Sequence, residues 1–221
     1  MGTDIANLGY LALPPGGSGP GVVVLQEWWG LVPHIKTVAD RFAEAGFVAI
    51  APDLYNGETT TSPDEAGRLF MALNIEQTAR RLEETFQYLQ SHPAVTGDRL
   101  GVVGFCMGGQ LALLAATLSQ RVGAVVDFYG IHPNVQPDFS KLRAPVLGIF
   151  GENDGFVTPE AVRSLEAAIQ QAGGSIETHT YAGADHAFFN DTRPEVYQPE
   201  AAADAWDRTL RFLKKELAAI E

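Results

Sequence analysis

The sequence is poor in cysteine, in cationic side chains and in long apolar runs. Its 221 residues contain one cysteine, which excludes an internal disulfide framework and a zinc site built on paired cysteines. No apolar run approaches the roughly 18 residues that cross a bilayer, and the first five residues do not begin a signal peptide. We therefore expect a cytoplasmic protein whose cysteine is reduced.

Positive charge is also scarce. Lysine and arginine number 15 against 27 aspartates and glutamates, so the net charge is −12. Such a surface repels nucleic-acid phosphates and anionic lipids, and we expect neither nucleic acid nor a membrane as partner. The 46% hydrophobic content suffices for one buried core, so we expect residues 1–221 to form a single domain, as a monomer or weak homodimer.

Short apolar runs alternate along the chain with segments of helical periodicity. This order is typical of an α/β fold with a mostly parallel central sheet and helices on both faces. The predicted strands are residues 22–25, 47–51, 100–103, 124–129, 145–150 and 176–181, after an edge strand near 9–13. The predicted helices are residues 34–45, 63–73, 75–89, 109–118, 159–172 and 201–217. In such sheets functional residues gather beyond the carboxyl ends of the strands.

The single cysteine lies between a predicted strand and a predicted helix, in Gly104-Phe-Cys-Met-Gly-Gly109. A nucleophile centred in Gly-x-Cys-x-Gly at such a junction is typical of a nucleophile elbow. The glycines let strand and helix approach where the backbone turns sharply. A lone cysteine is more often a small buried hydrophobic residue, so the interpretation of Cys106 depends on partners elsewhere.

Two such partners follow later predicted strands. Asp154 comes just after one strand and His186 just after the last. The order nucleophile, acid, histidine is that of α/β-hydrolases. The imidazole can take the thiol proton, the carboxylate can fix the imidazole tautomer, and N–H groups of the helix that begins near Met107 can stabilise an oxyanion.

Both partners have rivals in the sequence. His132 also follows a strand end and competes with His186, while Glu152 lies nearer its strand and competes with Asp154, which we favour. Asp53 ends a strand as well, but such an acid more often braces a loop. The remaining histidines are expected to be structural or to face solvent: His34, His92 and His179.

A fourth candidate is Glu27, which ends the first core strand in Leu25-Gln-Glu-Trp-Trp-Gly30. A carboxylate beside two tryptophans is partly desolvated, and desolvation raises its pKa. The alternative is an ordinary loop acid facing solvent.

Five segments together resemble the dienelactone hydrolase family, over about residues 9 to 217. They are Gln26-Glu-Trp-Trp-Gly-Leu31, Ala51-Pro-Asp-Leu-Tyr55, Gly104-Phe-Cys-Met-Gly-Gly109, Gly151-Glu-Asn-Asp154 and Asp185-His-Ala-Phe188. The resemblance implies an α/β-hydrolase fold and hydrolysis of a small ester or lactone through a cysteine thioester, with no metal or organic cofactor.

The resemblance also implies roles for individual residues. Cys106, His186 and Asp154 would form the triad, and the backbone N–H groups of Met107 and Trp28 the oxyanion hole. The residue matching Glu27 lies near the thiol in this family, where it keeps the cysteine protonated and helps to activate it when substrate enters. We expect the substrate pocket to be lined by Trp29, Phe188 and Asn190.

The chain departs from the family where dienelactone hydrolases bind the substrate carboxylate with two arginines and a tyrosine. Asn190 stands at one arginine position, and Pro63-Asp-Glu-Ala-Gly67 contains neither the other arginine nor the tyrosine. Arg68 and Arg193 are close in sequence, and whether either reaches the pocket stays open, as does the substrate.

Two other functions stay open as well. One is a non-catalytic ligand-binding or redox-sensing protein on the same fold. It would bind an apolar ligand near four aromatic side chains, Trp28, Trp29, Phe188 and Phe189. The other is a hydrolase of bulkier substrates, such as peptides or polyesters.

Overall fold

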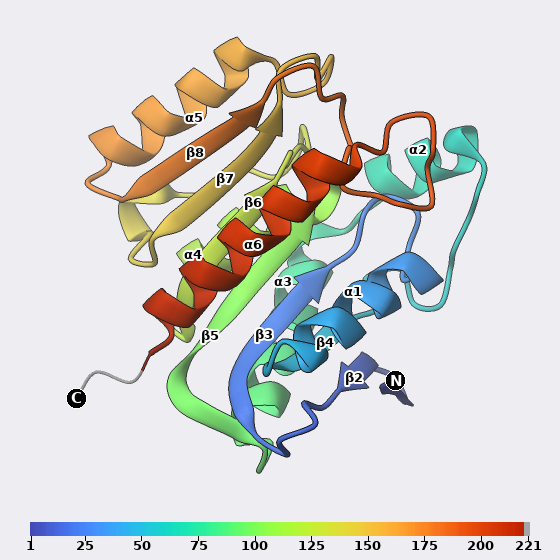
Figure 1. Ribbon diagram of the computed structural model, residues 1–221, viewed down its shortest axis with the longest axis vertical. Helices are drawn as coiled ribbons and strands as arrows, with labels where there is room; N and C mark the ends of the chain where they lie inside the picture. Colours follow the sequence, from blue (N-terminus) through green and yellow to red (C-terminus); the bar gives the residue numbers. More distant parts are fainter. Residues whose placement is uncertain (219–221) are drawn as a thin grey trace.

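The computed structural model describes residues 1–218 of the chain, and eight strands form one sheet (Figure 1). The strand order is β1-β2-β4-β3-β5-β6-β7-β8. Strands β3 to β8 run parallel to one another, whereas β2 is antiparallel to both of its neighbours, β1 and β4. The strands are β1 (Thr3–Ile5), β2 (Gly9–Ala12), β3 (Gly19–Leu25), β4 (Val48–Pro52), β5 (Val95–Phe105), β6 (Val122–Phe128), β7 (Val146–Gly151) and β8 (Ile176–Tyr181).

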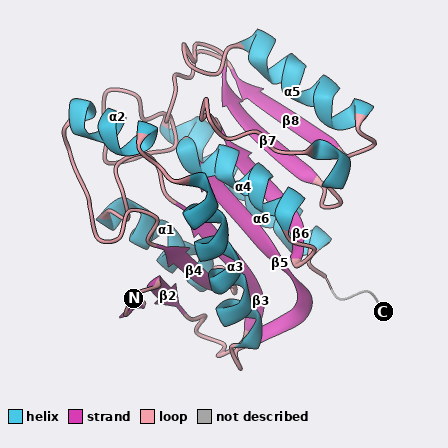
Figure 2. Cartoon of the chain, turned by 180° about the vertical axis from the view of Figure 1, so that it is seen from behind, coloured by secondary structure: helices cyan, strands magenta, loops and turns pink. Residues whose placement is uncertain are grey.

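Helices cover both faces of this sheet. The pair α1 and α6 lies on the face seen in Figure 1, and α3 and α4 lie on the face seen in Figure 2. The helices are α1 (Pro33–Glu44), α2 (Pro63–Met71), α3 (Ile75–Ser91), α4 (Met107–Leu118), α5 (Pro159–Gln171) and α6 (Pro199–Glu216). The predicted fold class, a mostly parallel sheet between two helical layers, is therefore confirmed.

Strands β3, β4, β6 and β7 and the second half of β5 are buried on both faces, which explains their continuous apolar runs. Along β3, Val22 and Val24 belong to the core under α1 and α6, whereas Val23 and Leu25 belong to the core under α3 and α4. Burying both sides of each strand stabilises the sheet by roughly 25 cal/mol for every Å² of apolar surface removed from water.

Element bounds differ from the prediction where apolar character is weak. Strand β1 was not expected, because it is three residues long and mostly exposed. Strand β5 begins at Val95, five residues before its apolar run, because its exposed first half pairs with Gly19 and Pro20. Helix α4 begins at Met107 and includes two glycines, which are poor helix formers in isolation.

Within residues 1–218, no helix is both long enough and apolar enough to cross a membrane.

Candidate active site

Cys106 occupies a strained turn between β5 and α4. Its φ and ψ of 54° and −116° lie where residues with a side chain are rarely found. A Cβ on Gly104 would stand 1.8 Å from the carbonyl oxygen of Gly108, and one on Gly108 would stand 2.4 Å from that of Leu25. The two glycines therefore permit the close crossing of strand and helix that holds the cysteine in this turn.

His186 forms a short pair with Asp154. Its Nδ1 lies 2.7 Å from Oδ2 of Asp154, and the other carboxylate oxygen accepts the N–H groups of Phe156 and Val157, each at 2.8 Å. Asp154 is thus buried and fixed by three partners. Glu152, its rival in the sequence, is exposed and accepts the N–H of Gly183 instead.

The surroundings of His186 favour its protonated form once Cys106 has become a thiolate. Burial alone lowers the pKa of the imidazole, but hydrogen bonding and charge from Asp154 and Cys106 outweigh burial and raise that pKa to about 10. The rings of Tyr129 and Phe156 lie 5.0 and 5.1 Å from the imidazole. His186 is therefore suited to take and hold a proton next to a sulfur anion.

His132 lines the same cavity but its ring nitrogens are both engaged. Nδ1 accepts the N–H of Asn134 at 3.1 Å, so the proton lies on Nε2, which donates to the carbonyl oxygen of Phe70 at 2.9 Å. In addition, burial lowers the pKa of His132, which favours its neutral form. These contacts make His132 a brace between α2 and the loop after β6 rather than a proton acceptor.

Glu27 is buried, with 1% of its surface exposed. Its Oε2 accepts a hydrogen bond of 2.7 Å from Nδ2 of Asn190. Oδ1 of Asn190 accepts both the N–H and the hydroxyl of Thr192, which fixes the orientation of the amide. Burial raises the pKa of Glu27, against the opposing effects of His34, Asn190, His186 and Arg193. The expected raised pKa is confirmed, and the loop-acid alternative is wrong.

These residues meet at a cavity of about 610 Å³, which we call the Cys106 cavity. Its volume suits a small organic molecule. Most of its walls are apolar, and Glu27, Cys106 and His186 all line it. It is lined by Glu27, Trp28, Trp29, Pro63, Phe70, Cys106, Gln110, Gly130, Ile131, His132, Pro133, Val135, Gln136, Phe156, Val157, Ala161, His186, Ala187 and Arg193.

Only part of the expected pocket lining is found there. Trp29 lines the Cys106 cavity, but Phe188 is fully buried and packs on Tyr129 and Tyr181, with ring centroids 5.7 and 5.1 Å apart. Asn190 faces Glu27 instead of the cavity. The expectation for Phe188 and Asn190 is wrong because the turns after His186 carry these side chains inward, and irregular turns leave no periodic signal in a sequence.

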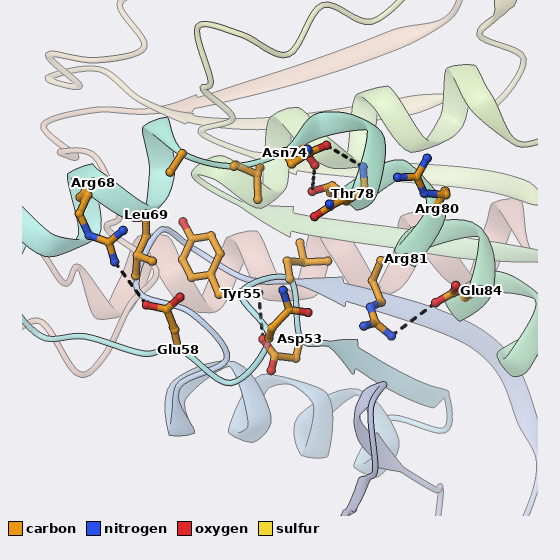
Figure 3. Close-up of a pocket in the computed structure, with 15 residues that line it drawn as sticks. Asp53, Tyr55, Glu58, Arg68, Leu69, Asn74, Thr78, Arg80, Arg81 and Glu84 are labelled. Carbon is orange, nitrogen blue, oxygen red and sulfur yellow. Dashed lines mark hydrogen bonds and ion pairs between the residues drawn. The ribbon is translucent and has the colours of Figure 1, made fainter.

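The structure places the two arginines, Arg193 and Arg68, in different hollows, so only one of them reaches the Cys106 cavity. Arg193 lines the Cys106 cavity, with its guanidinium carbon 5.7 Å from the centre of the Trp29 ring. Arg68 lies in a different hollow of about 360 Å³ between α2, α3 and the loop after β4, the α2–α3 groove (Figure 3). The groove is lined by Asp53, Leu54, Tyr55, Asn56, Glu58, Arg68, Leu69, Ala72, Leu73, Asn74, Gln77, Thr78, Arg80, Arg81 and Glu84.

Two amides can serve a developing oxyanion. Met107 is the first residue of α4, so its N–H has no acceptor within the helix. Trp28 follows β3 at the cavity wall. Across residues 1–218, neither N–H donates a hydrogen bond outside the helices and strands. Nor does the described part of the chain contain a group of three or more side chains placed to hold a metal ion.

A mostly parallel sheet, with a strained cysteine between a strand and a helix and a histidine–carboxylate pair beyond the ends of later strands, is the arrangement of an α/β-hydrolase. The model of the dienelactone hydrolase family matches residues 8–217. The chain belongs to that family and is a dienelactone hydrolase-like hydrolase.

Relatives and solved structures agree with this assignment. "Protein usf" of Aquifex pyrophilus is 36% identical over 217 residues, covering 95% of this chain and 93% of the relative. A "Probable 2-oxo-3-(5-oxofuran-2-ylidene)propanoate lactonase" of Bradyrhizobium sp is 34% identical, covering 96% and 90%. The "Putative Dienelactone Hydrolase" of Klebsiella pneumoniae superposes with a TM-score of 0.86 at 30% identity, covering 97% of this chain and 98% of its own.

Proposed function

We propose that this protein hydrolyses small esters or lactones through a thioester on Cys106, with His186 and Asp154 completing the triad. One observation carries the proposal. The strained cysteine shares a cavity with an imidazole whose far nitrogen is bonded to a buried carboxylate. A protein that only bound its ligand would have no use for this alignment.

The reaction proceeds in two halves. The sulfur of Cys106 attacks the carbonyl carbon while Nε2 of His186 takes the thiol proton, and the N–H groups of Met107 and Trp28 receive the oxyanion. The carbon–oxygen bond to the leaving group then breaks, and His186 protonates the departing alkoxide. In the second half His186 takes a proton from water, the hydroxide attacks the thioester, and the acid leaves as the thiol is restored.

Glu27 controls the thiol in this scheme. Its buried carboxyl lines the same cavity as Cys106, and a negative charge there opposes formation of a thiolate. Glu27 thereby keeps the cysteine protonated in the resting enzyme and helps to activate it when substrate enters.

The walls of the Cys106 cavity suit a substrate with an apolar body and one anionic group. Tryptophan, phenylalanine and isoleucine side chains supply the apolar surface, and Arg193 is the one arginine or lysine among the described lining residues. A guanidinium is the side chain that best matches a carboxylate. One relative is named as the lactonase of a propanoate, a lactone that itself carries a carboxylate.

The test is trapping of the thioester. The protein is mixed with a slowly hydrolysed ester, and its intact mass and peptide map are read within seconds. We expect one acyl group, on Cys106, and at least a 10³-fold loss of turnover in Cys106→Ala. Leu118→Ala, on the far end of α4, is the control. Full activity in Cys106→Ala would reject the mechanism, and saturable binding without turnover of any ester or lactone would favour the non-catalytic alternative.

A further inference from the structure

A second histidine–carboxylate pair is linked to Glu27 through two consecutive residues of the loop after β8. His34, on the first turn of α1, is buried with 4% of its side chain exposed, and its Nδ1 lies 3.2 Å from Oδ1 of Asp191. Asp191 itself is half-exposed. Among residues 1–218, Nε2 of His34 is one of few buried side-chain nitrogens with no hydrogen-bond partner. The triad proposed above does not use this pair.

The loop after β8 joins this pair to Glu27. Asn190 donates to the Glu27 carboxylate, and its neighbour Asp191 holds His34. Two consecutive residues thus fix the two side chains relative to each other. Asp191 fixes His34 with Nδ1 as the donor, which leaves the buried Nε2 without a hydrogen-bond partner among the described residues.

The electrostatics match this arrangement. After burial, which raises the pKa of Glu27, the strongest single influence is the charge of His34, which lowers that pKa. The other titratable or charged groups that act on Glu27 or share its cavity come from three other elements. They are Cys106 at the elbow, Tyr129 after β6, and His186 and Arg193 after β8.

We propose that His34, held by Asp191, sets the ionisation of Glu27 and through it the reactivity of Cys106. Protonated His34 stabilises the Glu27 carboxylate, and neutral His34 lets Glu27 keep its proton. His34 does not line the Cys106 cavity, so it is a positioning residue that acts on the chemistry without touching substrate. The inference rests on the proposed function only in treating Glu27 as part of the site.

The experiment measures the rate of Cys106 alkylation by iodoacetamide from pH 4 to 10, with no ester present. The inflection that disappears in Glu27→Gln reports the ionisation of Glu27. In His34→Gln we expect this inflection to move up by about one pH unit, which is about a tenfold change in rate at a fixed pH. Asp191→Asn keeps the ring but removes a half-exposed charge, and we expect a smaller shift in the same direction.

The matched control is His179→Gln, a histidine on β8 outside the Cys106 cavity, which should leave the inflection in place. An unmoved inflection in both His34→Gln and Asp191→Asn would overturn the proposal. The proposal would also be overturned if His34→Gln changed the pH profile as much in the Glu27→Gln background as in the wild type. A wild-type profile without the inflection would overturn it as well. Because alkylation needs no substrate, these outcomes are independent of whether an acyl-enzyme forms.

Discussion

The Cys106 cavity and the α2–α3 groove differ in how their charged groups are held. At the cavity, Glu27 and the Asp154 behind His186 are almost fully buried, and each is held by a few specific hydrogen bonds. In the groove, arginines are exposed and bonded to acids one helical turn away, as Arg68 is to Glu65. Figure 3 shows one such pair, Arg81 with Glu84, and a pair between α2 and the loop after β4, Arg68 with Glu58.

This difference distinguishes a site from a polar surface. Burial amplifies every charge in the cavity, so that pKa values move and a proton can be transferred. Solvent screens the charges of the groove, and its ion pairs contribute little. The volume of a hollow and its number of polar residues do not by themselves indicate chemistry, whereas buried charges with few partners do.

The largest expected effect is at the buried carboxylate. In Asp154→Asn the side-chain oxygen must still accept the N–H groups of Phe156 and Val157, so the amide NH2 faces Nδ1 of His186. The imidazole proton then moves to Nε2, which can no longer take the thiol proton. We expect kcat on a p-nitrophenyl ester to fall by about 10³–10⁴-fold with the fold unchanged.

The matched control is Glu152→Gln, which alters an exposed acid of the same loop. It should leave kcat within about twofold of wild type. A loss below tenfold in Asp154→Asn would contradict the proposed role of the pair.

The next effect concerns stability and the buried Asp127 at the end of β6. Burial raises the pKa of Asp127 to about 7, although its Oδ1 accepts the N–H of Gly130. Because the folded state keeps a proton that the unfolded chain releases near pH 4, stability from this group is lost as pH rises from about 4 to 7. Asp127→Asn should remove this loss. Relative to the wild type, the free energy of unfolding of the variant should therefore be higher at pH 8 than at pH 4.5 by on the order of 2–4 kcal/mol.

Urea unfolding of the wild type and of Asp127→Asn at the two pH values measures the change. Glu27 adds a slope of the same sign, since burial raises its pKa too, and Glu27→Gln measures that part separately. If the wild-type stability is the same at both pH values, Asp127 is not the buried, protonated acid described here.

A smaller effect is expected at Arg193, the one arginine or lysine among the described residues that line the cavity. Arg193 is about one-third exposed and shares its charge with Glu195, so its attraction for a substrate carboxylate is moderate. For Arg193→Gln we expect KM to rise about tenfold for an ester that bears a carboxylate and to stay unchanged for its neutral methyl analogue. Equal changes for both esters would show that Arg193 acts on packing and not on charge.

The parts of this site that the sequence predicts are those governed by regular structure. Cys106, Asp154 and His186 each follow a strand, and strand ends can be located from apolar runs. Asp154 was preferred to Glu152, and the structure pairs it with His186 as expected.

The parts that sequence reasoning missed lie in the irregular segment after His186. Phe188 was expected in the pocket and is in the core, Asn190 faces Glu27, and Arg193 reaches the cavity. The side-chain directions in this segment are set by turns and by a positive φ of 65° at Ala187, which follow no period. The burial of His34 beside Glu27 was missed for a related reason, since it depends on a contact with Asp191, 157 residues away.

The smallest effect is expected in the groove. Arg68 donates to both Glu65 and Glu58, but all three side chains are exposed, and the groove residues are not those that line the Cys106 cavity. Arg68→Gln should therefore leave KM for the carboxylate ester within twofold of wild type and the melting temperature within about 2 °C. Measured beside Arg193→Gln on the same two esters, this variant separates a cation at the cavity wall from a cation that merely lies near α2. A rise in KM for the carboxylate ester alone would place Arg68 on the path of the substrate, and the contrast between buried site and screened surface would then not hold for this molecule.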